Sequence, residues 1–119
     1  MCLNKLLYVA GPYAGDIEKN IKNAEKISIK LIKNGFHVLT PHKNLSGYEK
    51  YEDNNLTVQT WLKMDIDLLS RCDAIYVLKN YELSLGTLGE IEYAKKHNML
   101  IIYEYDYPNL TLNEYSQMM

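Results

Sequence analysis

Asp65 is an acidic residue in the middle of an apolar helical stripe. At about 100° per residue, the apolar side chains around it fall within about 60° of its own direction. They are Val58, Trp61, Leu62, Leu69 and Cys72. A carboxylate in such a stripe must be hydrogen-bonded, paired or directed into a cavity. Asp65 therefore either binds a neighbouring loop or buried tyrosine, or faces a binding site, and we favour the binding site.

Glu90 falls in the first turn of another helical run, within the stretch "SLGTLGEIEYA" (84–94). An acid near a helix N-terminus interacts favourably with the helix dipole, which is the structural explanation. Gly86 and Ala94, however, lie within about 60° of Glu90 and leave space beside it, as close packing or a ligand would require. Glu92 points elsewhere, and we assign Gly89 to packing.

Two inward-facing carboxylates, Asp65 and Glu90, suit glycosyl transfer. One acts as nucleophile at an oxocarbenium-like carbon, while the other performs acid/base work or holds the sugar. Ser84 forms no evident catalytic triad, because no histidine has a predictable position beside it.

The loop "AGPYAGD" (10–16) is a second candidate binding element. Gly11 and Gly15 allow close backbone approach, and the following helix N-terminus offers N–H groups for an anion or a sugar hydroxyl. The loop matches neither a Walker A sequence nor G-x-G-x-x-G. The alternative is a plain turn in which Asp16 caps the helix.

The three histidines lack the spacing of metal ligands, so we expect no metal and no cofactor. His37 is expected in a strand and His97 in solvent. His42 follows Pro41 at the end of a strand, near the expected rim of a cleft, where a ligand contact is an option.

Three aromatic residues and one further aspartate have open roles. Tyr13 and Tyr81 lie on loops and could stack on a base or be simply exposed. Trp61 has helical spacing with apolar residues, and we assign it to the core. Asp73 opens a strand and is expected to accept hydrogen bonds from nearby backbone N–H groups.

The elements that must position these residues alternate along the chain. β-rich runs cover 5–10, 36–40, 73–78 and 99–104, and helical periods cover 17–35, 56–72 and 86–98. The Asn34-Gly35 pair is a typical helix stop. Residues 42–55 and 79–84 are predicted as loops, and the tail 105–119 as a short helix beyond Pro108.

Strand–helix alternation with nearly continuous apolar strands predicts a parallel sheet covered on both faces. We expect one α/β domain over residues 1–119, a flavodoxin-like (Rossmann-like) three-layer sandwich of four to five strands in the order 2-1-3-4. The strand order then reverses between the first and third strands. Ligands bind beyond the carboxyl ends of strands at such a point, which is bordered by the loops at 10–16 and 79–86.

Composition limits the function classes. The 119 residues are 47% hydrophobic and 24% charged, with a formal net charge of -2, so neither duplex nucleic acid nor an anionic membrane is an expected partner. Cys2 and Cys72 are expected to be free thiols rather than a disulfide, which fits a reducing compartment. The apolar run near the N-terminus is too short for a signal or a membrane span, so we expect a cytoplasmic protein.

Three stretches together resemble the nucleoside 2-deoxyribosyltransferase superfamily. They are "LLYVAGPYAG", "WLKMDIDLLSRCDAIYVL" and "SLGTLGEIEYA", in the correct order over residues 5–104. The superfamily includes small deoxynucleoside 5′-monophosphate N-hydrolases and uncharacterised phage and bacterial proteins. The most specific element is Ser-x-Gly-x-x-x-Glu, matched by Ser84, Gly86 and Glu90.

The resemblance implies roles for individual residues. Glu90 matches the nucleophile that attacks the anomeric carbon, and Asp65 matches the carboxylate that contacts the sugar and assists protonation of the leaving base. Tyr8 matches a tyrosine that orients the nucleophile. The expected substrate-binding residues are Gly11, Pro12, Tyr13, His42, Ser84 and Gly86.

The chain also departs from the family pattern. The N-hydrolases carry a serine and an arginine in the first loop where this chain has Pro12 and Ala14, which weakens the case for a monophosphate. The transferases complete their site with a polar residue from a neighbouring subunit, which implies at least a homodimer. The tail 105–119 could lie at that interface, with Asn113 or Ser116 as candidates.

The leading hypothesis is an enzyme that cleaves the N-glycosidic bond of a (deoxy)nucleoside or its 5′-monophosphate, as a transferase or a hydrolase. Two alternatives stay open: a module that binds a nucleotide without turnover, and a structural domain with a vestigial site.

Overall fold

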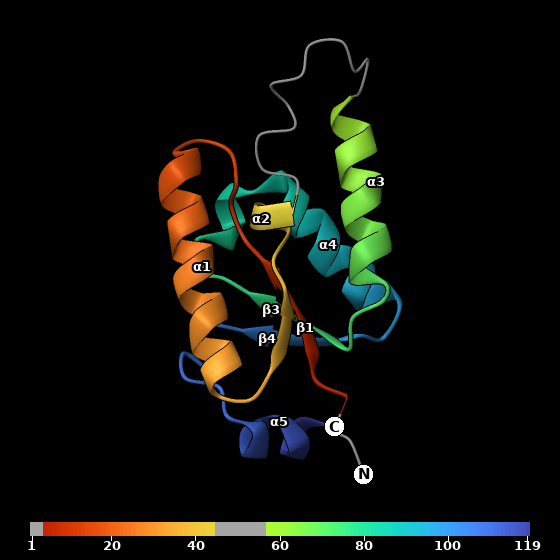
Figure 1. The fold of residues 1–119 in the computed structure, drawn as a ribbon. Helices are drawn as coiled ribbons and strands as arrows, with labels where there is room; N and C mark the ends of the chain where they lie inside the picture. Colours follow the sequence, from red (N-terminus) through yellow and green to blue (C-terminus); the bar gives the residue numbers. More distant parts are fainter. Residues whose placement is uncertain (1–3, 45–56) are drawn as a thin grey trace.

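The computed structural model describes residues 4–44 and 57–119 (Figure 1). Strands and helices alternate along the chain as the sequence predicts. The strands are β1 (Leu6–Ala10), β2 (His37–Leu39), β3 (Ala74–Val77) and β4 (Leu100–Tyr103). The helices are α1 (Ile17–Lys33), α2 (Pro41–Asn44), α3 (Val58–Leu69), α4 (Leu85–Lys96) and α5 (Leu112–Met118), with a 3₁₀ turn η3 (Tyr81–Leu83) before α4.

The four strands form one parallel sheet in the order β2-β1-β3-β4, which confirms the predicted order. In this register Tyr8 of β1 lies opposite Leu39 of β2 on one side and Ile75 of β3 on the other. The strand order reverses between β1 and β3, so the carboxyl ends of these two strands border the expected ligand position.

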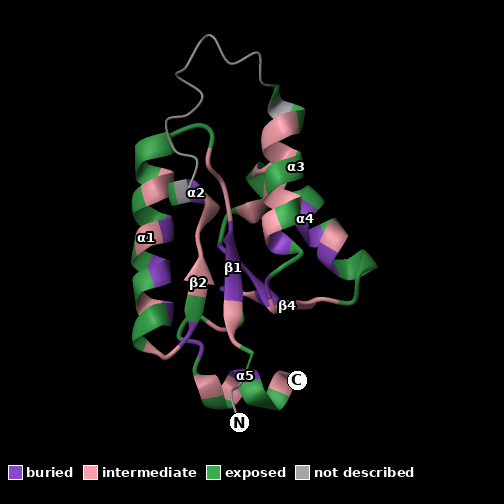
Figure 2. Cartoon of the chain, turned by 45° about the vertical axis from the view of Figure 1, so that its right-hand side comes forward, coloured by how far each residue is buried: buried purple, intermediate pink, exposed green. Residues whose placement is uncertain are grey.

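Each face of the sheet is covered by helices, which gives the predicted three-layer sandwich. Figure 1 shows α1 on one side of the sheet and α3 with α4 on the other. Alternation along β1 sends Leu7 and Val9 to the α1 side, and Tyr8 and Ala10 to the α3–α4 side. In Figure 2 the buried positions of α1 follow the side that faces the sheet.

Side-chain caps fix where the helices begin. The carboxylate of Asp16 accepts a hydrogen bond from the backbone N–H of Lys19, which confirms it as the N-cap of α1. Ser84 caps α4 by accepting from the N–H of Thr87. Some of the backbone N–H groups in the first turns of α1 and α4 are therefore already hydrogen-bonded to side chains of the protein.

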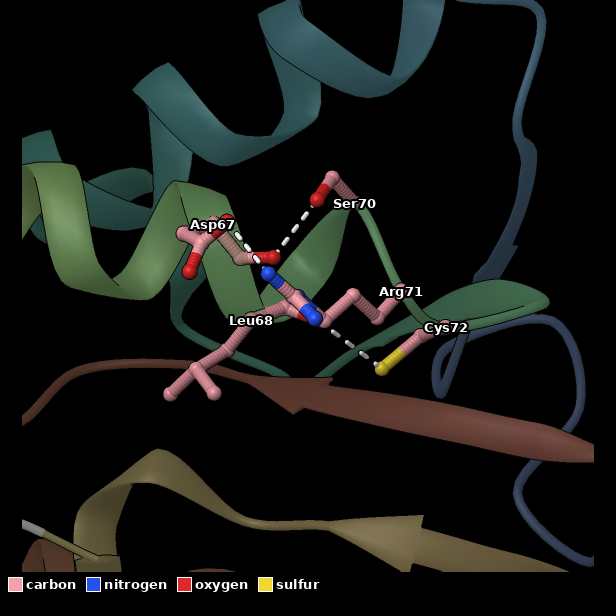
Figure 3. A network of polar contacts seen from close by, with 5 residues as sticks. All are labelled: Asp67, Leu68, Ser70, Arg71 and Cys72. Carbon is pink, nitrogen blue, oxygen red and sulfur yellow. Dashed lines mark hydrogen bonds and ion pairs between the residues drawn. The ribbon is translucent and has the colours of Figure 1, made fainter.

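Polar contacts at the end of α3 anchor the helix that carries Asp65 (Figure 3). Ser70 Oγ donates to the carbonyl of Asp67 at 2.6 Å, and the Cys72 thiol donates to the carbonyl of Leu68 at 3.5 Å. Arg71 pairs with the exposed Asp67 carboxylate at 3.3 Å. Cys72 is a free, buried thiol; Cys2 lies outside the described residues. Together these bonds close the helix and direct the chain into β3.

The C-terminal segment packs against the body of the domain. The predicted short helix is α5, and its Tyr115 is fully buried with its ring edge-on to Phe36 at 5.3 Å between centroids. The Tyr115 hydroxyl donates to the carbonyl of Asn4. Asn113 and Ser116 are exposed.

Three predictions about element boundaries needed correction. Glu90, expected in the first turn of its helix, lies in the second turn, because α4 begins at Leu85. Residues 41–44, partly assigned to a loop, form the helix α2, which Pro41 begins as a favoured first helical residue; residues 45–55 of that predicted loop lie outside the described residues. The predicted loop 79–84 contains the η3 turn. Within residues 4–44 and 57–119, no helix is both long and apolar enough to cross a membrane.

Candidate active site

A cleft of about 550 Å³ opens at the carboxyl end of β1, where the strand order reverses. Its walls come from β1 and the loop after it, from α2, from α3, and from the start of α4. The residues expected to be catalytic or substrate-binding all line this cleft: Tyr8, Gly11, Pro12, Tyr13, His42, Asp65, Ser84, Gly86 and Glu90. Segments far apart in the sequence thus bring the two carboxylates into one cavity.

Glu90 lies at the buried end of the cleft. It is only 8% exposed, and the hydroxyl of the fully buried Tyr8 donates a hydrogen bond to its carboxylate. Tyr8 reaches Glu90 because even-numbered residues of β1 face α3 and α4. Burial raises the pKa of Tyr8, and the charges of Glu90 and Asp65 raise it further. The phenol therefore stays protonated and acts as a donor.

Asp65 faces the same space from α3. Its Oδ1 is buried and has no hydrogen-bond partner among the described residues, so this oxygen binds neither a neighbouring loop nor a tyrosine there. Burial raises the pKa of the Asp65 carboxyl from 3.8 to about 6. A carboxylic acid with such a pKa exchanges protons readily near neutral pH.

The two carboxylates influence each other. Burial raises the pKa of Glu90 from 4.5 to about 7; the hydrogen bond from Tyr8 opposes the rise and the charge of Asp65 adds to it. Both carboxyls therefore gain or lose a proton near neutral pH, and the charge of either one affects the titration of the other.

The rim formed by the start of α4 carries paired hydroxyls. Both the backbone N–H and the side-chain hydroxyl of Thr87 lie within hydrogen-bond distance of Ser84 Oγ, at 3.2 and 3.0 Å. Thr87 is a buried cleft residue that the sequence did not single out. Its signal was the i, i+3 spacing from Ser84 that is common at helix starts.

Three glycines at or near the cleft differ in how much space surrounds them. A Cβ at Gly11 would lie 2.7 Å from Leu78 Cδ1, so this glycine lets the chain just after β1 pass close to the residue that follows β3. A Cβ at Gly86 would make ordinary contacts, 3.5 Å from Leu62 Cδ2 and 3.9 Å from Ser84 Oγ. A Cβ at Gly89 would meet nothing within 4 Å, so the assignment of Gly89 to packing was wrong.

His42 closes the cleft beside the first loop. Its Nε2 lies 2.9 Å from the carbonyl oxygen of Pro12. Because a carbonyl only accepts, Nε2 carries the hydrogen. Burial lowers the pKa of His42, with the carbonyls of Pro12 and Gly11 acting in the opposite direction. The Tyr13 ring lies edge-on to the imidazole at 6.2 Å, so loop and α2 form one wall.

The structure separates the remaining aromatic candidates. Trp61 is half-buried and lines the cleft, so its assignment to the core was wrong. The cause is that its helix stripe faces a cavity at this end of the sheet rather than packed side chains. Tyr81 lies outside the cleft and packs on Tyr103 at 5.4 Å. Leu83 and Leu85, which the sequence analysis did not select, line the rim and are largely exposed.

Asp73 has the structural role that was expected. Its Oδ2 accepts a hydrogen bond from the backbone N–H of Leu6 at 2.8 Å, at the opposite end of the strands from the cleft. His37 lies exposed in β2, and His97 is exposed at the end of α4. In the part of the chain that the structure describes, no group of three or more His, Cys, Asp or Glu side chains could hold a metal ion.

A family model described as a domain of unknown function (DUF4406) matches residues 5–103. The chain belongs to this family. DUF4406 is a family of the nucleoside 2-deoxyribosyltransferase superfamily, so the resemblance drawn from the three sequence stretches is confirmed. No curated protein matches the sequence.

Solved structures agree with this family assignment at the level of the fold. A 2-deoxyribosyltransferase from Leishmania mexicana superposes with a TM-score of 0.61 at 19% identity, over 83% of this chain and 63% of that one. This chain therefore spans less than two thirds of the Leishmania protein. A 2-deoxyribosyltransferase from Bacillus psychrosaccharolyticus, described as a biocatalyst for nucleoside synthesis, superposes with a TM-score of 0.59 at 19% identity. The match covers 82% of this chain and 70% of that one.

Proposed function

We propose that this protein cleaves the N-glycosidic bond of a (deoxy)nucleoside or its 5′-monophosphate through a covalent glycosyl-Glu90 intermediate. The observation that carries the proposal is the pair of carboxyls in one cleft: Glu90, nearly buried and hydrogen-bonded by Tyr8, and Asp65 on the facing helix. Both have a raised pKa, as is common for the acid and base groups of active sites.

In the first half-reaction a Glu90 oxygen forms a bond to the anomeric carbon while the bond from that carbon to the base nitrogen breaks. The base leaves with the electron pair and takes a proton from Asp65. In the second half-reaction water or a second base attacks the same carbon, Glu90 leaves as a carboxylate, and Asp65 takes up the acceptor's proton. Water gives hydrolysis, and a second base gives transfer.

The surrounding residues have supporting roles in this proposal. Tyr8 holds the Glu90 carboxylate toward the sugar. Ser84 and the backbone at Gly86 contact the sugar or its 5′ end, and the Gly11–Tyr13 loop with His42 forms the opposite wall. We further propose a homodimer, because the resemblance to the superfamily implies a site that a neighbouring subunit completes.

The test is release of free base from a panel of deoxynucleosides and their 5′-monophosphates, with and without a second base as acceptor. Glu90→Gln should reduce turnover by about a hundredfold or more. Glu92→Gln is the matched control, because Glu92 is an exposed residue of the same helix. A nucleoside with a fluorine at C2′ slows breakdown of the intermediate, so intact-mass measurement should find one glycosyl group on the protein and none on Glu90→Gln.

Nucleotide binding without any base release would favour the non-catalytic module instead. Full activity of Glu90→Gln would remove Glu90 from the role of nucleophile. If neither binding nor turnover were found across the panel, the structural alternative would hold.

A further inference from the structure

We propose that the cleft takes the unphosphorylated nucleoside rather than its 5′-monophosphate. This inference rests on the proposed function and selects between its two substrate classes. Three features of the cleft support it: the charge inside it, the occupation of its first helix terminus, and the hydroxyl groups at its second.

The first feature is the charge of the cleft. Asp65 and Glu90 are both acidic, and His42 is held as the neutral ring by burial, with its Nε2–H donating to the Pro12 carbonyl. The described residues that line the cleft include no lysine or arginine. In a cavity with largely apolar walls, a phosphate dianion so close to a carboxylate meets a repulsion that water screens poorly.

Lys43, a basic residue next to the cleft wall in the sequence, is paired with an acid. Lys43 directly follows His42, but its Nζ pairs with the Glu25 carboxylate at 2.8 Å on the outside of α1. It is not a residue of the cleft wall. The basic side chain that directly follows His42 is therefore already paired with an acid.

The second feature is the start of α1, which follows the first cleft loop. A helix N-terminus normally suits a phosphate, but here the carboxylate of Asp16 accepts the Lys19 N–H at 3.2 Å. The Asn20 side-chain amide donates to the carbonyls of Tyr13 and Ala14 at 3.1 and 2.9 Å. Two donors near this helix start are thus used by the protein itself, and the exposed Asp16 carboxylate places a negative charge at the helix terminus that follows the cleft loop.

The third feature is the start of α4. Ser84 Oγ accepts from the Thr87 N–H, and the two hydroxyls pair at 3.0 Å. A pair of neutral hydroxyls matches a sugar hydroxyl, which both donates and accepts. The first backbone N–H groups of α4 would bind a hydroxyl or a phosphate, so a direct comparison of the two substrates decides the question.

The experiment compares kcat/KM for 2′-deoxyadenosine and for its 5′-monophosphate, with thymidine and its monophosphate as a second pair, by measuring the released base. We expect the nucleoside to exceed the monophosphate by about tenfold or more. Raising the salt concentration from about 0.05 M to about 0.5 M should narrow that ratio, because salt screens the phosphate–carboxylate repulsion. A ratio of one or less, or a monophosphate preference, would overturn the inference.

Thermal unfolding separates this inference from the proposed function. A nucleoside that raises Tm more than its monophosphate at equal concentration supports the substrate class even if no base is released, and that combination overturns the proposed function alone. A larger shift with the monophosphate overturns the substrate class alone. No shift and no release with either ligand would overturn both.

Asp16→Asn tests one step of the explanation without removing the cap, because asparagine is an equally good N-cap. The variant should raise the monophosphate rate relative to the nucleoside rate by about twofold to fivefold. Asp67→Asn is the control, since Asp67 is an exposed acid paired with Arg71 away from the cleft. An unchanged ratio in Asp16→Asn would overturn the role given to Asp16.

Discussion

The hydroxyl of Tyr8 on β1 donates a hydrogen bond to the carboxylate of Glu90 on α4, 82 residues further along the chain. Tyr8 is fully buried, so the bond holds Glu90 against the strand and toward the cleft. It also favours the ionised carboxylate, acting against the burial that raises the pKa of Glu90. A nucleophilic carboxylate in an apolar site needs such a donor.

Replacing Tyr8 with phenylalanine should lower kcat by about tenfold to a hundredfold. Without the donor the pKa of Glu90 rises further, so the acid limb of the kcat/KM–pH profile should move to higher pH. Steady-state rates across a pH series measure both effects. Tyr76→Phe is the matched control: this buried tyrosine of β3 bonds the Tyr107 carbonyl and packs on the other face of the sheet. An unchanged pH profile in Tyr8→Phe would contradict the role of the bond.

Glu90→Gln should stabilise the protein at high pH and not at low pH. The pKa of Glu90 in the folded protein, about 7, lies above the ordinary 4.5. The folded state therefore holds the proton more tightly than the unfolded state. The free energy of unfolding falls as the pH rises from the ordinary pKa of 4.5 through the folded-state pKa of about 7. The Tm of Glu90→Gln should exceed that of the wild type by about 2 °C or more at about pH 8 and match it at about pH 5.

Calorimetry or dye-based melting at several pH values measures this difference. Glu92→Gln, at an exposed position of the same helix, should give a difference that does not vary with pH. A pH-independent difference for Glu90→Gln would mean that Glu90 is not a buried acid with a raised pKa.

Asp65→Asn should separate acid catalysis from sugar binding. With natural nucleosides the base needs a proton to leave, so removing the acid should cost about a hundredfold in kcat. In a 2-deoxyriboside of 4-nitrophenol the leaving group is 4-nitrophenolate, which departs without a proton. Cleavage of this substrate should therefore be much less affected. Base release and nitrophenolate absorbance measure the two rates. An equal loss with both substrates would assign Asp65 to holding the sugar instead.

Much of this arrangement could be predicted because it depends on periodicity. The alternation of strand and helix patterns predicts a parallel sheet, and right-handed crossovers leave few strand orders, among which 2-1-3-4 is the first choice. Helical spacing was sufficient to orient Asp65 and Glu90, because a wheel shows which residues share a face. Asp16 as a cap follows from side-chain chemistry at a helix start.

Other features depend on tertiary contacts that periodicity does not describe. Trp61 has the spacing of a core residue, but the stripe of α3 extends past the sheet into the cleft. The role of Gly11 depends on Leu78 of the adjacent chain segment, and that of Gly89 on open space around it. The bond between Tyr8 and Glu90 does not follow from periodicity; the family resemblance predicted that Tyr8 orients Glu90, and the folded chain brings β1 and α4 together to form the bond.

Gly86 and Gly89 provide the last prediction, because they lie in the same helix and differ in what surrounds them. A helical glycine costs about 0.5–1 kcal/mol relative to alanine, and neither position has a close contact that excludes a methyl group. Both Gly86→Ala and Gly89→Ala should therefore raise Tm by a few degrees. Gly86 lines the cleft and Gly89 does not. Only Gly86→Ala should lose activity, by about tenfold in kcat/KM, since its methyl group enters the space of the substrate. If Gly86→Ala gains stability and keeps full activity, the substrate does not approach the start of α4.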